Sequence, residues 1–75
     1  MEDFTIHPQC VTGLNVNVPF LIATLGLTDS DDAARELLAS GEVSLNGVPL
    51  LLTRVPVATA RNQTISCLGR SWRLL

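Results

Sequence analysis

The stretch SDDAARELLASGEVSLNG, residues 30–47, constrains the fold more than any other part of the chain. Ser30 is a favoured N-cap residue, and the two aspartates that follow it lie where the helix dipole stabilises negative charge. Gly41 supplies the positive φ at which helices commonly end. Asn46-Gly47 is the strongest short sequence signal for a two-residue β-hairpin turn. The stretch therefore predicts a short capped helix, an abrupt stop, and a strand that enters a hairpin.

The apolar residues of the predicted helix share one face. Ala34, Leu37 and Leu38 recur at three- and four-residue spacing, so this face is expected to pack inward. Arg35 and Glu36 are expected to point away from it. The helix therefore presents a charged outer face beside the hairpin that follows.

After this helix, the pattern changes to that of strands. Val43 and Leu45 alternate with polar residues, as on a strand with one buried face. Residues 48–52 are expected to return as the partner strand, with their proline placing it near a sheet edge. Residues 53–57 are expected to extend that strand, and residues 58–63 to form a loop.

The C-terminal segments TISCL and SWRLL predict a closing hairpin around Gly69-Arg70. Its inward-facing residues are expected to be Ile65, Cys67, Trp72 and Leu74. Trp72 is accordingly interpreted as a core residue rather than a base-stacking platform.

The N-terminal third carries weaker signals. DFTIHP, residues 3–8, is expected to be a short extended piece, and CVTGLNVN, residues 10–17, a loop. VPFLIATLGL predicts a mostly buried helix with Pro19 in its first turn and Gly26 at its end. Together these elements predict an α+β fold in which two short helices pack on a small, mostly antiparallel sheet.

Charge is divided sharply along the chain. All seven acidic residues lie in residues 1–42 with Arg35 as the one base, a net charge of −6. Residues 43–75 contain no acid and carry a charge of +4, contributed by Arg54, Arg61, Arg70 and Arg73. The planar guanidinium group suits phosphate, so this half predicts an anionic partner. The alternative is a solvated surface whose charges happen to be segregated.

Other functional classes find little support in the residues. Cys10 and Cys67 form no C-x-x-C pair and the chain has one histidine, so no metal site is predicted and both thiols are expected to be buried. No nucleophile, base and orienting group can be assembled, so no catalysis is expected. The longest apolar run, residues 18–27, is ten residues long, against about 20 needed to span a bilayer. We expect a cytoplasmic protein with no membrane partner.

Two motifs carry a family resemblance. The spacing of Ser30, Ala34-Arg35, Leu37-Leu38, Gly41, Val43, Leu45 and Asn46-Gly47 closely resembles the S-four-like RNA-binding domain, first named from a small-subunit ribosomal protein. The tail CLGRSWRLL is similar to the closing hairpin of bacterial-type tyrosyl-tRNA synthetases, which carry such a domain at their C-terminus. The segment VPFLIATLGLTDS looks like the helix that leads into it. The resemblance implies an S-four-like domain over residues 18–75, an N-terminal extension or linker over residues 1–17, and Met1 as an expression start.

The resemblance also implies a function. The domain would bind tRNA, or another structured RNA, for a tyrosine–tRNA ligase whose catalytic domain is absent from this chain. ATP and tyrosine would bind that domain, so this one needs no cofactor. Arg35 would contact phosphate, and the Asn46-Gly47 turn would shape one rim. Arg70 and Arg73 would add contacts, and the set of candidate RNA-binding residues is completed by Arg54 and Arg61.

Acidic residues depart from the family pattern, in which the second helix usually carries further basic residues. Glu36 follows Arg35 directly, and aspartates stand at positions 29, 31 and 32. Carboxylates near phosphate oppose binding, so binding is weak, or has moved to the arginine-rich half, or is lost. Arg35 has its own alternative, an ion pair with Asp31 or Asp32 along its helix. The open alternatives for the chain are an S-four-like module of a ribosomal or RNA-modifying protein, and a protein-interaction module without RNA binding.

Overall fold

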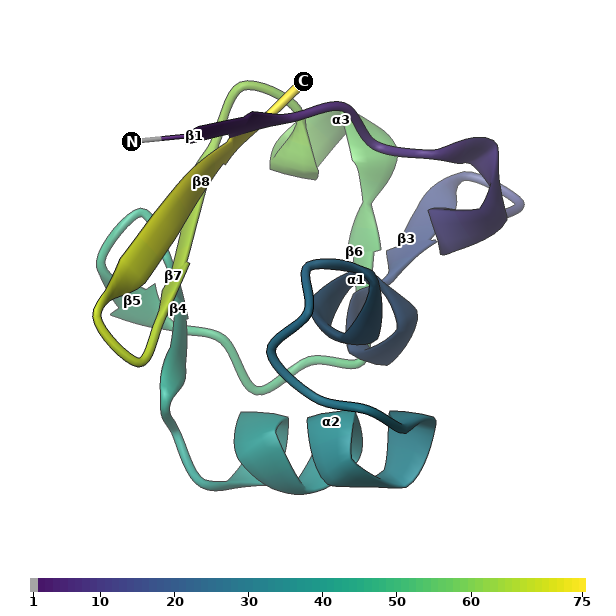
Figure 1. Ribbon diagram of the computed structural model, residues 1–75. Helices are drawn as coiled ribbons and strands as arrows, with labels where there is room; N and C mark the ends of the chain where they lie inside the picture. The colour runs from purple at the N-terminus through teal and green to yellow at the C-terminus, as the bar shows by residue number, and fades with distance from the viewer. Residues whose placement is uncertain (1) are drawn as a thin grey trace.

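Two sheets enclose the core in the computed structural model, which describes residues 2–75 (Figure 1). The larger sheet has the order β1-β8-β7-β4-β5, and its strands are β1 (Glu2–Phe4), β8 (Arg70–Leu74), β7 (Thr64–Cys67), β4 (Val43–Leu45) and β5 (Val48–Pro49). The smaller sheet has the order β2-β3-β6, and its strands are β2 (Val11–Thr12), β3 (Asn15–Asn17) and β6 (Arg54–Pro56). β1 runs parallel to β8, and every other pair is antiparallel.

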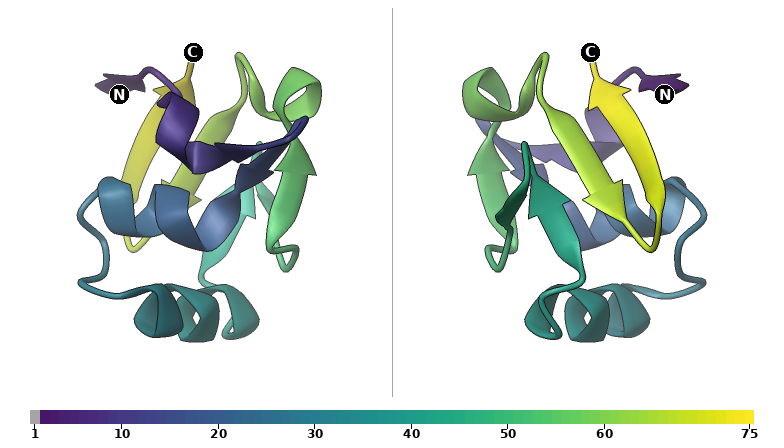
Figure 2. Two further views of the ribbon diagram at one scale, coloured as in Figure 1. Left: turned by 90° about the vertical axis from the view of Figure 1, so that its right-hand side faces the viewer. Right: turned by 90° about the vertical axis from the view of Figure 1, so that its left-hand side faces the viewer.

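The helices pack beside these sheets. They are the 3-10 helix η1 (Pro8–Cys10), α1 (Val18–Thr24), α2 (Asp31–Ala39) and the single turn α3 (Val57–Ala60). α2 lies against α1, along the bottom of Figure 1. The right-hand view of Figure 2 places β4, β7 and β8 in front with α1 behind them. The predicted α+β class is therefore confirmed.

The unit from Ser30 to Gly47 forms as its sequence predicts. Ser30 is the N-cap of α2, and its Oγ accepts a hydrogen bond from the Ala33 N–H at 3.1 Å. Gly41 has a φ of +81° just beyond the helix, and Asn46 and Gly47 both have positive φ, at +52° and +82°. Two successive residues with positive φ are typical of the type I′ hairpin turn.

The inward faces are also confirmed. Ala34 and Leu38 of α2 are buried, and Leu37 is partly buried against them. On the closing hairpin, all four predicted inward residues are buried: Ile65, Cys67, Trp72 and Leu74. The turn itself lies one residue earlier than predicted. Leu68 and Gly69 have the positive φ values, and Arg70 already pairs with Cys67 across the ladder.

The helix predicted in VPFLIATLGL is confirmed as α1, with Pro19 in its first turn, and it ends at Thr24. Gly26 lies just beyond it with a φ of +86°, as predicted. Its N-cap is Asn17, whose Oδ1 accepts from the Phe20 N–H at 3.3 Å. The interpretation of residues 10–17 as a loop includes Asn17, so the sequence did not predict it as the N-cap of α1.

That interpretation of residues 10–17 is wrong. The segment forms the β2–β3 hairpin, with Val11 opposite Val16 and Gly13 at a φ of +64° in the turn. Val16 also pairs with Val55 of β6 and is buried. Strands this short carry too few alternating residues to show a period, and their asparagines and glycine read as loop signals.

Residues 48–63 depart from the prediction in a related way. The partner strand β5 ends at Pro49, and residues 54–56 pair with β3 in the smaller sheet rather than extending β5. The Leu50 N–H still donates to the Val43 carbonyl at 2.8 Å, and beyond it residues 51–53 leave β4 and lead to β6. The predicted loop over residues 58–63 begins with three residues of the α3 turn.

The described part of the predicted N-terminal extension is built into the fold. Residues 2–17 contribute strands to both sheets. Three of their side chains belong to the single buried core: Ile6, Cys10 and Val16. Packing therefore does not separate residues 2–17 from the segment that follows them.

Replacing Ser30 with alanine tests the α2 cap. The change removes the acceptor for the Ala33 N–H, which lies in the exposed first turn. We expect the free energy of unfolding to fall by about 1 kcal/mol in a denaturant titration. Ser40→Ala is the control: it removes a serine hydroxyl at the other end of α2, where Ser40 Oγ donates to the Leu37 carbonyl at 2.6 Å and accepts from no first-turn N–H. Equal midpoints for Ser30→Ala and the native chain would show that this hydrogen bond does not hold the helix end.

Candidate nucleic-acid interface

Arg35 lies on the outer face of α2, and it is ion-paired. Its Nε is 3.0 Å from Oδ2 of Asp31, one helical turn earlier, and both side chains are about half exposed. An exposed pair at this spacing contributes about 0.3–0.5 kcal/mol. The sequence left open whether Arg35 pairs with Asp31 or Asp32, and the structure pairs it with Asp31. A phosphate replacing this carboxylate would break only a weak interaction.

Asn46 fastens the hairpin turn to the neighbouring strand. Its Oδ1 accepts from the Thr64 N–H at 3.0 Å, and its own N–H donates to the Thr64 carbonyl at 2.8 Å. The side chain therefore has a structural role at the start of β7. Gly47 is exposed beside it. The turn is therefore held to β7 by hydrogen bonds on one side and is open to solvent on the other.

Arg70 and Arg73 lie on β8, on opposite faces of the strand because they are three residues apart. The Arg70 guanidinium carbon is 4.7 Å from the centre of the Trp72 ring, a cation–π distance. Trp72 itself is 4% exposed, which confirms its place in the core.

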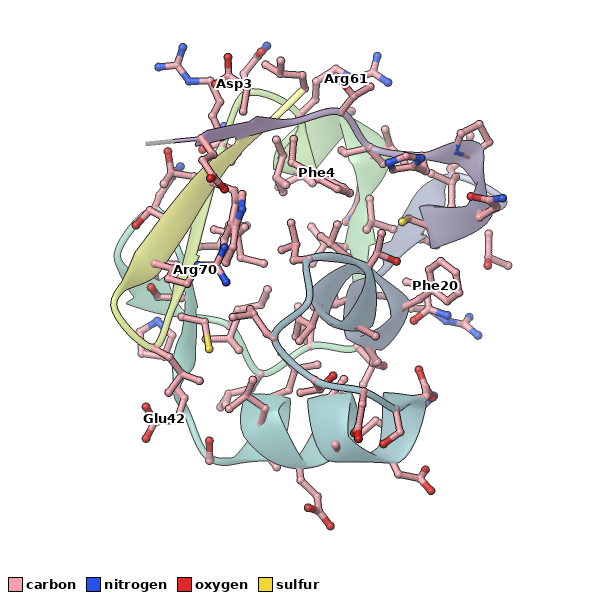
Figure 3. All side chains as sticks on the ribbon, viewed as in Figure 1. Asp3, Phe4, Phe20, Glu42, Arg61 and Arg70 are labelled. Atoms are coloured by element: carbon pink, nitrogen blue, oxygen red, sulfur yellow. The ribbon has the colours of Figure 1, made fainter. Side chains whose placement is uncertain are left out.

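The acidic strand β1 runs alongside these two arginines. Oε2 of Glu2 is 3.9 Å from Nη2 of Arg70, and Asp3 is opposite Arg73 in the β1–β8 register. In Figure 3, Arg70 lies at the left over β8, and Asp3 lies above it at the top of the molecule. The segregation of charge along the sequence is therefore not kept in space. The arginine half contains no acid, but the fold returns two acids to it.

Arg54 and Arg61 lie elsewhere. Arg54 is on β6 of the smaller sheet, opposite Asn17, and Arg61 follows α3. Both are exposed, and Figure 3 shows Arg61 at the top of the molecule, away from Arg70. The candidate RNA-binding residues are thus distributed over α2, the β4–β5 turn, β6, the end of α3 and β8, and do not form one patch.

The cysteines offer no reactive group. Cys10 and Cys67 are both buried free thiols, as the sequence predicts. Burial, and secondarily the charge of Glu42, raise the pKa of the Cys67 thiol. The thiol therefore stays protonated near pH 7, the form that is a poor nucleophile.

Within residues 2–75, no three His, Cys, Asp or Glu side chains are grouped so that they could hold a metal ion. None of the helices in that range has the length and apolar character needed to cross a membrane.

Comparison with known proteins adds no assignment. No family model matches the chain, and no curated protein matches it.

Proposed function

We propose that the chain binds structured RNA, with tRNA as its principal ligand, through the outer face of α2 and the β4–β5 turn. The observation that supports this proposal is the unit from Ser30 to Gly47, in which a capped helix with Arg35 on its outer face leads directly into a hairpin turn. A rigid helix beside a turn offers a shelf that can recognise folded RNA by shape and through its phosphates. β8 supplies Arg70 and Arg73 as secondary contacts.

In the cell, the domain would serve a tyrosine–tRNA ligase in the cytoplasm. It would position tRNA for aminoacylation by a separate catalytic domain, which would bind ATP and tyrosine. This chain would perform no chemical step itself. An S-four-like module of a ribosomal or RNA-modifying protein would use the same residues, so the RNA that binds most tightly distinguishes these assignments.

A protein-interaction role is the second candidate. It is favoured by the acidic strand β1, which places Glu2 and Asp3 beside the β8 arginines and opposes an approaching phosphate. If the chain has this role, it keeps the fold but does not bind RNA. The two candidates make opposite predictions for a titration with RNA.

Titration of labelled tRNA at several salt concentrations tests the proposal. Arginines are the chain's only cationic side chains apart from His7, so log K is expected to fall with log salt by about 0.7–0.9 per phosphate neutralised. Arg35→Ala and the pair Arg70→Ala with Arg73→Ala should each weaken binding several-fold. Absence of binding at low salt, or affinity unaffected by these changes, would favour the protein-interaction role.

Neutralising β1 provides the complementary variant. Glu2→Gln with Asp3→Asn removes the carboxylates beside Arg70 and Arg73, so tRNA affinity should rise several-fold. Gln9→Lys with Thr12→Lys is the control, because it raises net charge by the same amount at exposed positions on η1 and β2, away from β1, β8 and α2. Equal gains from the two pairs would show that only net charge matters and that β1 does not oppose binding locally.

A further inference from the structure

An open apolar groove lies on a part of the surface that the proposed RNA contacts of α2 and β8 do not use. It has a volume of about 430 Å³, within the range of small-ligand and peptide sites. Its lining comes from the segment that leads into η1 and the first residue of η1, from the β2–β3 hairpin, and from α3 and the residue after it: Ile6, Pro8, Val11, Gly13, Leu14, Val57 and Arg61.

The walls of this groove are tied together. The Val57 N–H donates to the Leu14 carbonyl at 2.9 Å, which joins the start of α3 to the tip of the β2–β3 turn. The Arg61 N–H donates to the Val57 carbonyl at 2.9 Å, which closes the α3 turn. These two hydrogen bonds hold α3 against the β2–β3 turn, so this part of the groove is fixed by backbone contacts.

Leu14 is unusually exposed for a large apolar residue. Its exposed fraction is 85%, the highest among the large hydrophobic residues of the described chain. It stands at the rim beside the partly buried Val11 and Val57. A bulky apolar side chain laid into the groove would remove this surface from water, and that is the favourable term in docking.

Arg61 gives the groove its charge. It is the one charged residue among the described lining residues. The ion pairs found within residues 2–75 involve Arg35 and Arg70 and not Arg61. A carboxylate would complement this guanidinium, whereas a second cation would be repelled.

We propose that this groove binds a peptide segment of a partner protein, in which a bulky apolar residue lies next to an aspartate or glutamate. The apolar side chain packs against Leu14, Val11 and Val57. The carboxylate pairs with Arg61 at the rim. The apolar contact is separate from the proposed RNA contacts, since Leu14 and Val57 belong to neither α2 nor β8, whereas Arg61 is also one of the candidate RNA-binding residues.

Selection from a random heptapeptide library displayed on phage, with the intact chain as bait, tests the proposal. We expect an enriched consensus with Asp or Glu within two positions of Leu, Ile or Phe. The same selection on Arg61→Glu should exchange the acidic position for lysine or arginine. A synthetic peptide of the native consensus should bind Arg61→Glu several-fold more weakly.

Two leucine variants locate the binding surface. Leu14→Ser should weaken the consensus peptide about tenfold, because the contact area is lost, and should leave the melting temperature and tRNA binding unchanged. Leu68→Ser is the matched control: Leu68 is 61% exposed in the β7–β8 turn, so its loss should not alter peptide binding.

Three results would overturn the proposal. The first is no enriched consensus, and the second is a consensus without an acidic position or one that Arg61→Glu leaves unchanged. The third is self-association of the free chain in sedimentation that Leu14→Ser abolishes, because the groove would then be filled by a second copy.

Discussion

A chain that begins at Val18 is expected not to fold on its own. It lacks β1 and the β2–β3 hairpin, and with them the buried side chains of Ile6, Cys10 and Val16. Burial of Ile6 and Val16 alone contributes about 3–6 kcal/mol, at about 1.5–3 kcal/mol each. A domain of this size has a total stability of about 4–11 kcal/mol. β6 would also lose β3, its one ladder partner within residues 2–75.

Circular dichroism during thermal unfolding measures this effect. The truncated chain should show no cooperative transition, whereas the native chain should melt in one step. A chain that begins at residue 5 is the control, since it loses β1 but keeps the three buried side chains, and it should fold with a lower midpoint. If residues 18–75 melt cooperatively near the native midpoint, the N-terminal segment contributes little to the free energy of unfolding, and the fold does not need it.

Local signals account for the part of the fold that the sequence predicts. The Ser30 cap, the glycine stop at Gly41 and the Asn46-Gly47 turn each act within a few residues, and each forms as expected. The same is true of Pro19 and Gly26 at the two ends of α1. Such signals depend on backbone preferences that neighbouring residues satisfy, so they can be recognised without knowing the rest of the fold.

Long-range pairing accounts for what the sequence does not predict. β1 pairs with β8 from the opposite end of the chain, and β3 pairs with β6 across 37 or more residues of separation. Strands of two or three residues are too short for their sequence pattern to indicate which strand they pair with. The apolar residues at positions 4, 6, 11 and 16 were the available signal, because isolated apolar residues in a true linker would have nothing to pack against.

The candidate site follows the same division. The Arg35–Asp31 pair lies within one helical turn, and the sequence offered it as an alternative. The contact between Glu2 and Arg70 joins the two ends of the chain, so counting charges along the sequence placed them in separate halves. An electrostatic argument from sequence therefore holds along a helix and fails where strand pairing brings distant segments together.

Replacing Gly47 with valine should strongly destabilise the fold. Gly47 has a φ of +82°, and a Cβ added there would have no heavy atom within 4 Å beyond its chain neighbours. The cost is therefore conformational and not steric contact with the rest of the protein. An L-residue in this left-handed region costs about 1–2 kcal/mol, and β-branching makes it worse. We expect a loss of about 2 kcal/mol or more, measured as the free energy of unfolding in a denaturant titration.

Gly47→Asn is the matched control, because asparagine enters the same open space but tolerates positive φ. Asn46 already adopts a φ of +52° beside it, so this variant should lose well under half as much stability as Gly47→Val. The turn also positions the Asn46 amide that holds β7, so Gly47→Val should increase hydrogen exchange at the Thr64 N–H first. Equal losses for valine and asparagine would mean that the turn does not require the left-handed conformation, and that the rim beside α2 is held by β7 alone.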